Sequence, residues 1–359
     1  MLTADLAIDT RNKNVSDAQQ QSTIEARYSW EEIEKMASRV ALNEVDGVEI
    51  ISLADNTVDF LSTIERKEVH QVREWVKNRM GKEWARKHFR LPFAEHGFSM
   101  LIKVFSKGSF HIILFDTGVS RKGVVTNARR MGLNLTEIKC IVLSHGHYDH
   151  FGGLVDVLKA VDKKNLPIIA HENMFKTRGA VTSDGTVRKY PKFPSEDQVA
   201  PAKYLGTRQP YLLAGDSILV TGEIPRKTDF EKGFPRQRVF SDGKWQPDPW
   251  VWDDRAIVIN IKHKGLVVIS GCAHAGIANT TLYARQITGV AKVYAIMGGF
   301  HLAGKECEQR ISPTVEMLRQ LNPKTVVPSH CTGWRGKYAI FRAMPRAFVW
   351  NSVGNLYRF

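Results

Sequence analysis

Short apolar runs recur along most of the chain, each bounded by Gly, Asn or Asp, and segments with helical periodicity lie between several of them. The runs are predicted as strands, because runs of about four to eight apolar residues between turn-forming residues are typical of buried strands. They cover 48–56, 98–105, 110–118, 138–146, 166–172, 217–223, 255–262, 265–274, 292–299 and 324–330. Helices are predicted at 123–133, 152–161 and 312–321. The alternation predicts an α/β protein with much of its strand material buried between helices.

The N-terminal part of the chain has a different pattern. Its first 21 residues are polar and rich in Gln and Asn. Residues 29–45 combine Ser29 as an N-cap with acidic residues in the first turn and apolar residues at helical spacing, which predicts a short appended helix. The predicted organisation is therefore a leader with a short helix at 1–46 and one large domain at 47–359.

Residues 64–90 are predicted as a basic helical insertion in this domain. Apolar residues recur there near helical spacing, at Val69, Val72, Val76, Met80 and Trp84. Such a helix could face a nucleic acid or a membrane. The favoured interpretation is a solvated charged face whose apolar seam docks on the core.

Composition and charge narrow the class of protein. The chain has 359 residues, is 43% hydrophobic and 25% charged, and carries a formal net charge of +14, which is typical of a globular protein with an anionic partner. Residues 1–46 carry −4, so the rest carries +18. No apolar stretch approaches the roughly 18 residues of a membrane span, and the N-terminus lacks a signal-peptide pattern. Four cysteines without C-x-x-C spacing favour a reducing, cytoplasmic setting.

The most specific signal is IVLSHGHYDHFGGL at 141–154. Its H-x-H-x-D-H pattern places His145, His147, Asp149 and His150 in a turn between a predicted strand and a predicted helix. Imidazoles and a carboxylate are ligands for zinc, manganese or iron, and neighbouring sites of this kind can share a bridging water. The sequence therefore predicts a site for two divalent metal ions, with zinc as the first choice.

With the preceding LFDTG at 114–118, this pattern resembles the metallo-β-lactamase superfamily. Further motifs resemble one branch of it, the proteins similar to the archaeal 7,8-dihydropterin-6-methyl-4-(β-D-ribofuranosyl)aminobenzene 5′-phosphate synthase. These motifs are AEHGFS at 94–99, TGEIPR at 221–226, DDRAIV at 253–258, SGCAHAGIANT at 270–280, MGGFHL at 297–302 and PSHCTGW at 328–334. The resemblance runs from about residue 48 to residue 359.

The resemblance implies an αββα sandwich of two mixed sheets flanked by helices, with the metals at the sheet edges. It assigns His145 and His147 to a first metal and Asp149 and His150 to a second. The remaining ligands that it implies are His330 for the second metal and His274 for the last imidazole. Many members of the superfamily have a bridging aspartate where this chain has Cys272, so this thiol either ligates or fills space beside another bridging group.

Other residues receive weaker assignments. His301 ranks just below His274 as a ligand, and it is also a candidate acid or phosphate-binding group. Asp116 is expected to orient a ligand imidazole, although a turn-forming Asp would look the same. The candidate contacts to substrate are Glu223, Arg226, His301 and Ser329. For five further residues, a purely structural role is at least as well supported as a role at the site. They are His171, Glu95, His96, Asp253 and Asp254.

Two-metal chemistry activates water and stabilises charge on an ester or phosphate oxygen. The leading hypothesis is a hydrolase-type enzyme acting on an anionic, phosphorylated pterin-like or nucleotide-like molecule, with Asp149 or His301 carrying protons. The alternative, implied by the resemblance, is a synthase that condenses a phosphoribosyl donor with a hydroxybenzoate-type acid and releases carbon dioxide and pyrophosphate. Nucleic-acid processing is less favoured, because no RNA- or DNA-binding motif is visible. The sequence does not specify the oligomeric state.

Overall fold

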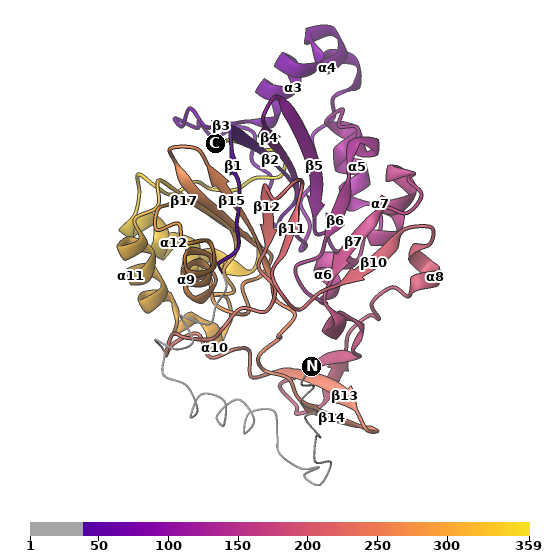
Figure 1. The fold of residues 1–359 in the computed structure, drawn as a ribbon, viewed down its shortest axis with the longest axis vertical. Coiled ribbons are helices and arrows are strands. Elements are labelled where there is room, and N and C mark those ends of the chain that lie inside the picture. The colour runs from indigo at the N-terminus through magenta and orange to yellow at the C-terminus, as the bar shows by residue number, and fades with distance from the viewer. Residues whose placement is uncertain (1–38) are drawn as a thin grey trace, which may run out of the picture. The chain divides into compact units, whose positions relative to one another are not determined.

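Two large mixed sheets lie face to face in the computed structural model, which describes residues 39–359 (Figure 1). The first sheet contains, in spatial order, β10 (Lys203–Gly206), β7 (Pro167–Ala170), β6 (Cys140–Val142), β5 (Ser109–Phe115), β4 (Ser99–Ser106), β2 (Gly47–Ala54), β19 (Leu356–Arg358) and β3 (Val69–His70). The second contains β11 (Tyr211–Leu213), β12 (Ile218–Val220), β15 (Ala256–Ile261), β16 (Gly265–Ser270), β17 (Val293–Gly299) and β18 (Thr325–Ser329). Each run predicted as a strand contains one of these strands.

The main core lies between the two sheets. Ile50 and Ile102 of the first sheet and Ile257 and Ile269 of the second are fully buried in one cluster. Because helices cover the outer faces as well, β15 and β16 are buried along their whole length. Burial on both faces explains why these strands appear in the sequence as continuous apolar runs and not as alternating ones.

Helices cover the outer face of each sheet, as the αββα prediction requires. The helices α3 (Val72–Met80), α5 (Gly123–Arg130) and α7 (Leu154–Val161) contribute buried side chains to the cluster on the first sheet. On the second sheet, the packed helices are α9 (Ile277–Thr288), α11 (Ile311–Leu321) and α12 (Gly333–Ala343). Figure 1 shows the two sets on opposite sides of the sandwich. The predicted helices at 123–133, 152–161 and 312–321 are confirmed as α5, α7 and α11.

Two sequence predictions need correction. Most of the helix predicted at 29–45 lies outside the described residues, but its last residues form a strand, β1 (Glu44–Val45), which pairs in parallel with β15. The domain therefore begins before residue 47. The basic segment 64–90 is not one helix, because Gly81 adopts a positive φ of 88° between α3 and α4 (Lys82–His88).

The apolar seam of this basic segment docks on the core. Val72, Trp75 and Val76 of α3 are buried in the cluster on the first sheet, and the Trp75 indole donates a hydrogen bond to the Gly354 carbonyl. Val69 belongs to β3 and not to a helix. The structure thus agrees with the docked-helix interpretation of α3.

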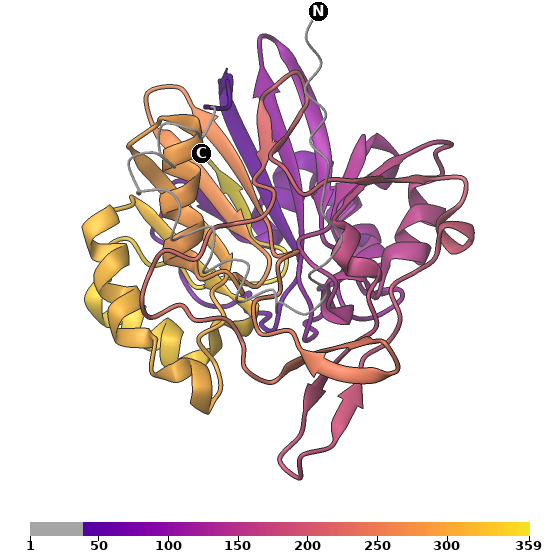
Figure 2. The same ribbon diagram turned by 60° about the horizontal axis from the view of Figure 1, so that its bottom comes forward.

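A third, small sheet was not predicted. It consists of β8 (Arg178–Val181), β9 (Val187–Lys189), β13 (Gln237–Ser241) and β14 (Lys244–Pro247). Its two hairpins stand together away from the large sheets (Figure 2). These strands are short and rich in charged residues, so they lack the apolar runs that identify the other strands.

Candidate metal centre

The H-x-H-x-D-H segment follows β6 of the first sheet. His145 and His147 lie in the turn after the strand, whereas Asp149 and His150 belong to the short helix α6 (Tyr148–Phe151). The three imidazoles are buried, and His145 Nε2 lies 2.9 Å from His147 Nδ1. One wall of the centre is therefore built from a single continuous segment.

The opposite wall comes from the second sheet. Cys272 and His274 follow β16, His301 follows β17, and His330 follows β18, so the residues leave the carboxyl ends of three neighbouring parallel strands. His301 and His330 have positive φ values of 44° and 47°. Non-glycine residues seldom adopt this conformation, and such backbone strain tends to cluster at functional sites.

The two walls bring the predicted ligands together. Ligand atoms of His145, His147 and His274 lie within 4.8 Å of one another. The same limit holds within two further groups, His145–His150–Cys272 and His96–Asp149–His330. The structure thus gathers all seven residues predicted as metal ligands in one buried place.

The donor chemistry of these residues fits divalent ions. Both ring nitrogens of buried His274 lack a hydrogen-bond partner, and so does Nε2 of His147. A buried polar atom without a partner costs free energy, so nearly all such atoms in proteins are satisfied. Burial lowers the pKa of His147 to about 4 and holds the pKa of His145 well below its usual range. Neutral imidazoles are the form that ligates metals.

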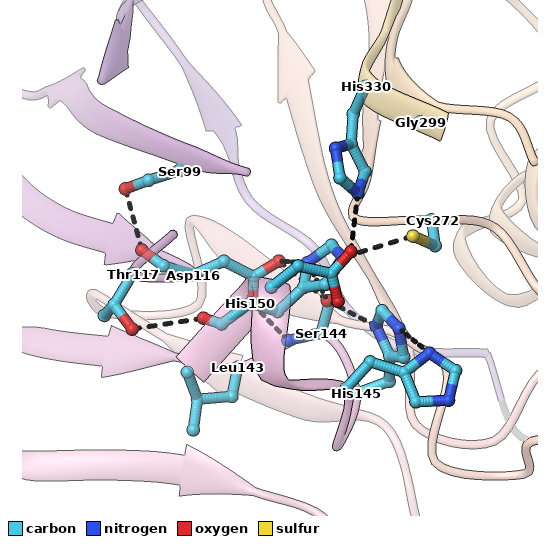
Figure 3. A network of polar contacts seen from close by, with 12 residues as sticks. Ser99, Asp116, Thr117, Leu143, Ser144, His145, His150, Cys272, Gly299 and His330 are labelled. Carbon is cyan, nitrogen blue, oxygen red and sulfur yellow. Dashed lines mark hydrogen bonds and ion pairs between the residues drawn. The ribbon is translucent and has the colours of Figure 1, made fainter. Parts of the chain in front are cut away.

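Asp116 orients His150 from within the first sheet. Its Oδ2 lies 2.6 Å from His150 Nδ1, and its Oδ1 accepts a hydrogen bond of 2.7 Å from the Ser144 backbone N–H (Figure 3). Burial alone would lower the pKa of His150, but the carboxylates of Asp116 and Asp149 outweigh burial and raise it to about 9. The geometry matches the role expected for Asp116, because a carboxylate on one ring nitrogen leaves Nε2 directed at the centre.

We expect Asp116→Asn to weaken zinc binding by about 10-fold to 100-fold, the usual effect of losing a group that orients a ligand imidazole. Zinc titration against a competing chelator measures this change. Asp242→Asn, at an exposed turn residue, is the control and should bind zinc like the wild type. Unchanged affinity in Asp116→Asn would contradict the orienting role.

Two acidic residues before β15 hold the turns of the two walls. Asp253 Oδ2 accepts a hydrogen bond of 2.8 Å from the Gly146 N–H, and the guanidinium of Arg178 binds both Asp253 oxygens at 2.6 and 2.5 Å. Asp254 accepts a hydrogen bond of 2.8 Å from the Ala275 N–H. These two residues therefore do more than close a turn, because each fixes the backbone beside a predicted ligand.

A buried carboxyl also caps the helix that follows His274. Glu231 accepts hydrogen bonds from the N–H groups of Ala278 and Asn279 at the start of α9. Burial raises the pKa of Glu231 from 4.5 to about 7. The folded chain therefore holds this proton more tightly than the unfolded chain, and ionisation of Glu231 opposes folding as the pH rises through this range.

Consequently, Glu231→Gln should gain stability relative to the wild type as the pH rises from about 5 to about 8, by up to about 3 kcal/mol. Urea unfolding of both proteins at the two pH values measures the difference. Glu65→Gln, at an exposed position, should show a pH-independent difference. A constant difference for Glu231→Gln would refute this pKa assignment.

Three of the predicted substrate contacts have partners within the protein. Both Nη groups of Arg226 donate to backbone carbonyls, those of Ile224 and Trp250 among them, and buried Ser329 donates to the Val327 carbonyl. These contacts occupy the donors expected to bind a phosphate, so the structure does not favour that role for either residue. Glu223 lies 3.1 Å from Nε2 of buried His171, and neither belongs to a ligand group among the described residues.

His301 lies on the second-sheet wall of the centre. Its ring stacks at 4.2 Å from that of His274, and its Nδ1 has no hydrogen-bond partner. Burial would lower its pKa, but the neighbouring thiols of Cys307 and Cys331 outweigh burial and raise it to about 10. His301 is thus placed to touch the centre, as predicted.

Sequence reasoning missed or undervalued three residues of the centre. Asp55 accepts a hydrogen bond of 2.7 Å from the His330 N–H, Cys331 lies beside Cys272, and His96 stacks on His330 at 4.8 Å between ring centroids. His96 is two-thirds exposed, and its Nε2 lies 3.8 Å from Asp149 Oδ2. Asp55 follows an apolar strand just as Asp116 does, which is the one signal that could have identified it.

No helix in the described part of the chain combines the length and apolar composition of a membrane span.

Residues 95–285 match the profile of the metallo-beta-lactamase superfamily. The chain is 33% identical over 280 residues to the 7,8-dihydropterin-6-methyl-4-(beta-D-ribofuranosyl)-aminobenzene-5′-phosphate synthase of Methanocaldococcus jannaschii, covering 76% of this chain and 92% of the relative. An uncharacterised protein of the same archaeon is 30% identical over 268 residues, covering 74% and 93%.

Solved structures show the same fold. The crystal structure of Tm1679, described as a metal-dependent hydrolase of the beta-lactamase superfamily, matches this chain with a TM-score of 0.63 at 24% sequence identity. The match covers 87% of this chain and 98% of the other. The similarity agrees with the αββα architecture, in which the ligand-bearing turns lie at the ends of strands from both sheets.

Proposed function

Because this chain is an enzyme that belongs to the metallo-β-lactamase superfamily, we propose that it is a metal-dependent hydrolase acting on an anionic, phosphorylated small molecule. The observation that carries the proposal is the pair of ligand groups at the centre. His145, His147 and His274 form one group of buried donors, and buried His330, partly buried Asp149 and exposed His96 form another.

We assign the first of two ions to His145, His147 and His274, and the second to Asp149, His150 and His330. Cys272 Sγ lies 3.1 Å from His150 Nε2 and shares a ligand group with His145, so this thiol would be available as a further ligand. Zinc is the expected metal, since it accepts imidazole, carboxylate and thiolate ligands alike. Manganese and iron are the alternatives.

When bound, divalent ions would act as Lewis acids on a phosphate or ester oxygen and lower the pKa of water. The protein itself supplies groups that hydrogen-bond the water and pass its proton on. Burial would raise the pKa of Asp149, but the imidazoles of His150 and His330 outweigh burial and hold it well below its usual range. The ionised carboxylate lies beside the exposed His96 ring, which offers a route for the proton to solvent. His301, on the other wall, is the second candidate proton carrier.

The charge of the chain supports an anionic substrate. The net charge of +14 attracts phosphorylated molecules and raises their rate of encounter. Nucleic acid is the less favoured partner, because no RNA- or DNA-binding motif is visible in the sequence. The four cysteines are free, which is compatible with a cytoplasmic location.

The second candidate is the synthase reaction, and the relative from Methanocaldococcus jannaschii favours it. In that reaction, the centre would bind the diphosphate of a phosphoribosyl donor as a hydroxybenzoate-type acid condenses and loses carbon dioxide. Both candidate reactions would use the same metal ligands, but they differ in the substrates and in the bond that is made or broken.

Two assays on the zinc-loaded protein separate the candidates. Hydrolysis of bis(p-nitrophenyl) phosphate that a chelator abolishes and zinc restores would support the hydrolase. Release of pyrophosphate only when phosphoribosyl diphosphate and 4-hydroxybenzoate are both present would support the synthase. If neither reaction depends on the chelated metal, the proposed function is wrong.

A further inference from the structure

Three of the four cysteines gather at the second-sheet wall of the centre. Cys272 follows β16, Cys331 follows His330, and Cys307 lies on the short helix α10 (Lys305–Glu308), beside His301. The fourth, Cys140, is buried in β6 and belongs to no ligand group among the described residues. These three thiols come from separate segments, so their spacing in the sequence does not predict that they lie close together.

The thiols of Cys272 and Cys331 face one ligand group from two strands. Ligand atoms of Cys272, His330 and Cys331 lie within 4.8 Å of one another, and a second group joins Cys272 to His274 and His301. Gly299, at the end of β17, permits this approach. A Cβ at residue 299 would lie 3.2 Å from the Cys272 Cα, a tight contact, and 2.7 Å from Cys331 Sγ, closer than real Cβ contacts.

A second, independent observation indicates a ligand at this place. His274 is 2% exposed, yet both of its ring nitrogens have no hydrogen-bond partner, and Nε2 of buried His330 faces the Asp149 carboxylate at 3.2 Å. The His274 imidazole therefore leaves its ring nitrogens unsatisfied beside the Cys272 thiol. Thiolate and imidazole together are the preferred ligands of zinc and other thiophilic divalent ions.

We propose that Cys331 is a metal ligand and that Cys272 and Cys331 together give the centre a thiolate face selective for thiophilic cations. As each sulfur–metal bond forms, the thiol loses its proton to solvent, so no oxidant or reductant is involved. The inference rests on the proposed metal-dependent function and deepens it by stating which metals the centre takes. Zinc, cobalt and cadmium should bind, and magnesium should not displace them.

Cobalt substitution under reducing conditions tests the proposal. The cobalt-loaded wild type should show sulfur-to-cobalt charge-transfer absorption in the near ultraviolet, and Cys331→Ser should reduce it about twofold. Cys272→Ser should give a similar loss. Cys140→Ala, which removes a thiol distant from the centre, should retain the full absorption. Full absorption in Cys331→Ser, with cobalt still bound, would overturn the inference.

X-ray absorption on the zinc-loaded wild type needs no variant and therefore does not depend on the folding of one. It should detect two sulfur atoms per centre at about 2.3 Å from zinc. One sulfur atom or none would refute a face made of the two thiolates. These spectra are independent of turnover, so sulfur ligation without either activity would leave this inference standing and reject the proposed function. Turnover without sulfur ligation would reject this inference and leave the proposed function standing.

Discussion

Replacing His145 with alanine is expected to remove metal from the centre and to abolish turnover. His145 takes part in two ligand groups, one with His147 and His274 and one with His150 and Cys272, so its loss disturbs both proposed ion sites. If bound metal supplies about 4 kcal/mol of transition-state stabilisation, the rate falls about a thousandfold. Elemental analysis of the purified variant and the assay that is positive for the wild type measure the two effects.

The matched control is His88→Ala, which removes an exposed imidazole at the end of α4. It should keep the metal content and the rate of the wild type. Circular dichroism establishes whether His145→Ala is folded. A folded His145→Ala variant with undiminished metal content would refute the assignment of the centre.

Replacing Arg178 with methionine is expected to destabilise the whole domain. Arg178 and Asp253 form a buried ion pair at 2.5 Å, and Arg178 Nε also donates to Asp248 at 3.1 Å. Removing the cation leaves the Asp253 carboxylate buried without its partner, which costs about 3–5 kcal/mol of the free energy of unfolding. Urea unfolding at neutral pH measures this loss.

The pH dependence of this effect has a definite sign. Burial would raise the pKa of Asp253, but Arg178 outweighs burial and holds it well below its usual range, so the pair stabilises the fold at neutral pH and fails only in strong acid. Lys189→Met, at an exposed residue of β9, is the control and should change stability by less than about 0.5 kcal/mol. A similarly small change in Arg178→Met would show that the buried pair contributes little.

What could be predicted from the sequence depended on how local the signal was. The H-x-H-x-D-H segment carries four predicted ligands within six residues, and each apolar run marks a strand that is largely buried. The roles of Asp55 and Arg178 could not be predicted, because Asp55 meets His330 and Arg178 meets Asp253 only after distant segments have packed. A single Asp or Arg has no pattern that reveals such a partner.

Local patterns also misled where tertiary packing decided the structure. Glu44 and Val45 continue a helical pattern in the sequence, yet they form a strand because the edge of β15 offers backbone partners. Arg226 stands in a motif that predicted a phosphate contact; its Nη groups donate to carbonyls of its own and a neighbouring loop, and the phosphate contact stays a prediction. In both cases the residues make backbone hydrogen bonds that the sequence pattern does not show.

The division of the ligands between two sheets sets an order for the assembly of the centre. The first wall is complete once the segment 145–150 has been synthesised, whereas Cys272 lies 122 residues after His150 and His330 is later still. Contacts of such long range form late in folding, after the loop entropy of the intervening chain has been overcome. If the proposed centre holds two ions, full loading must wait for β18 to join its sheet. A nascent chain that ends before β18 lacks His330, the ligand proposed for the second ion.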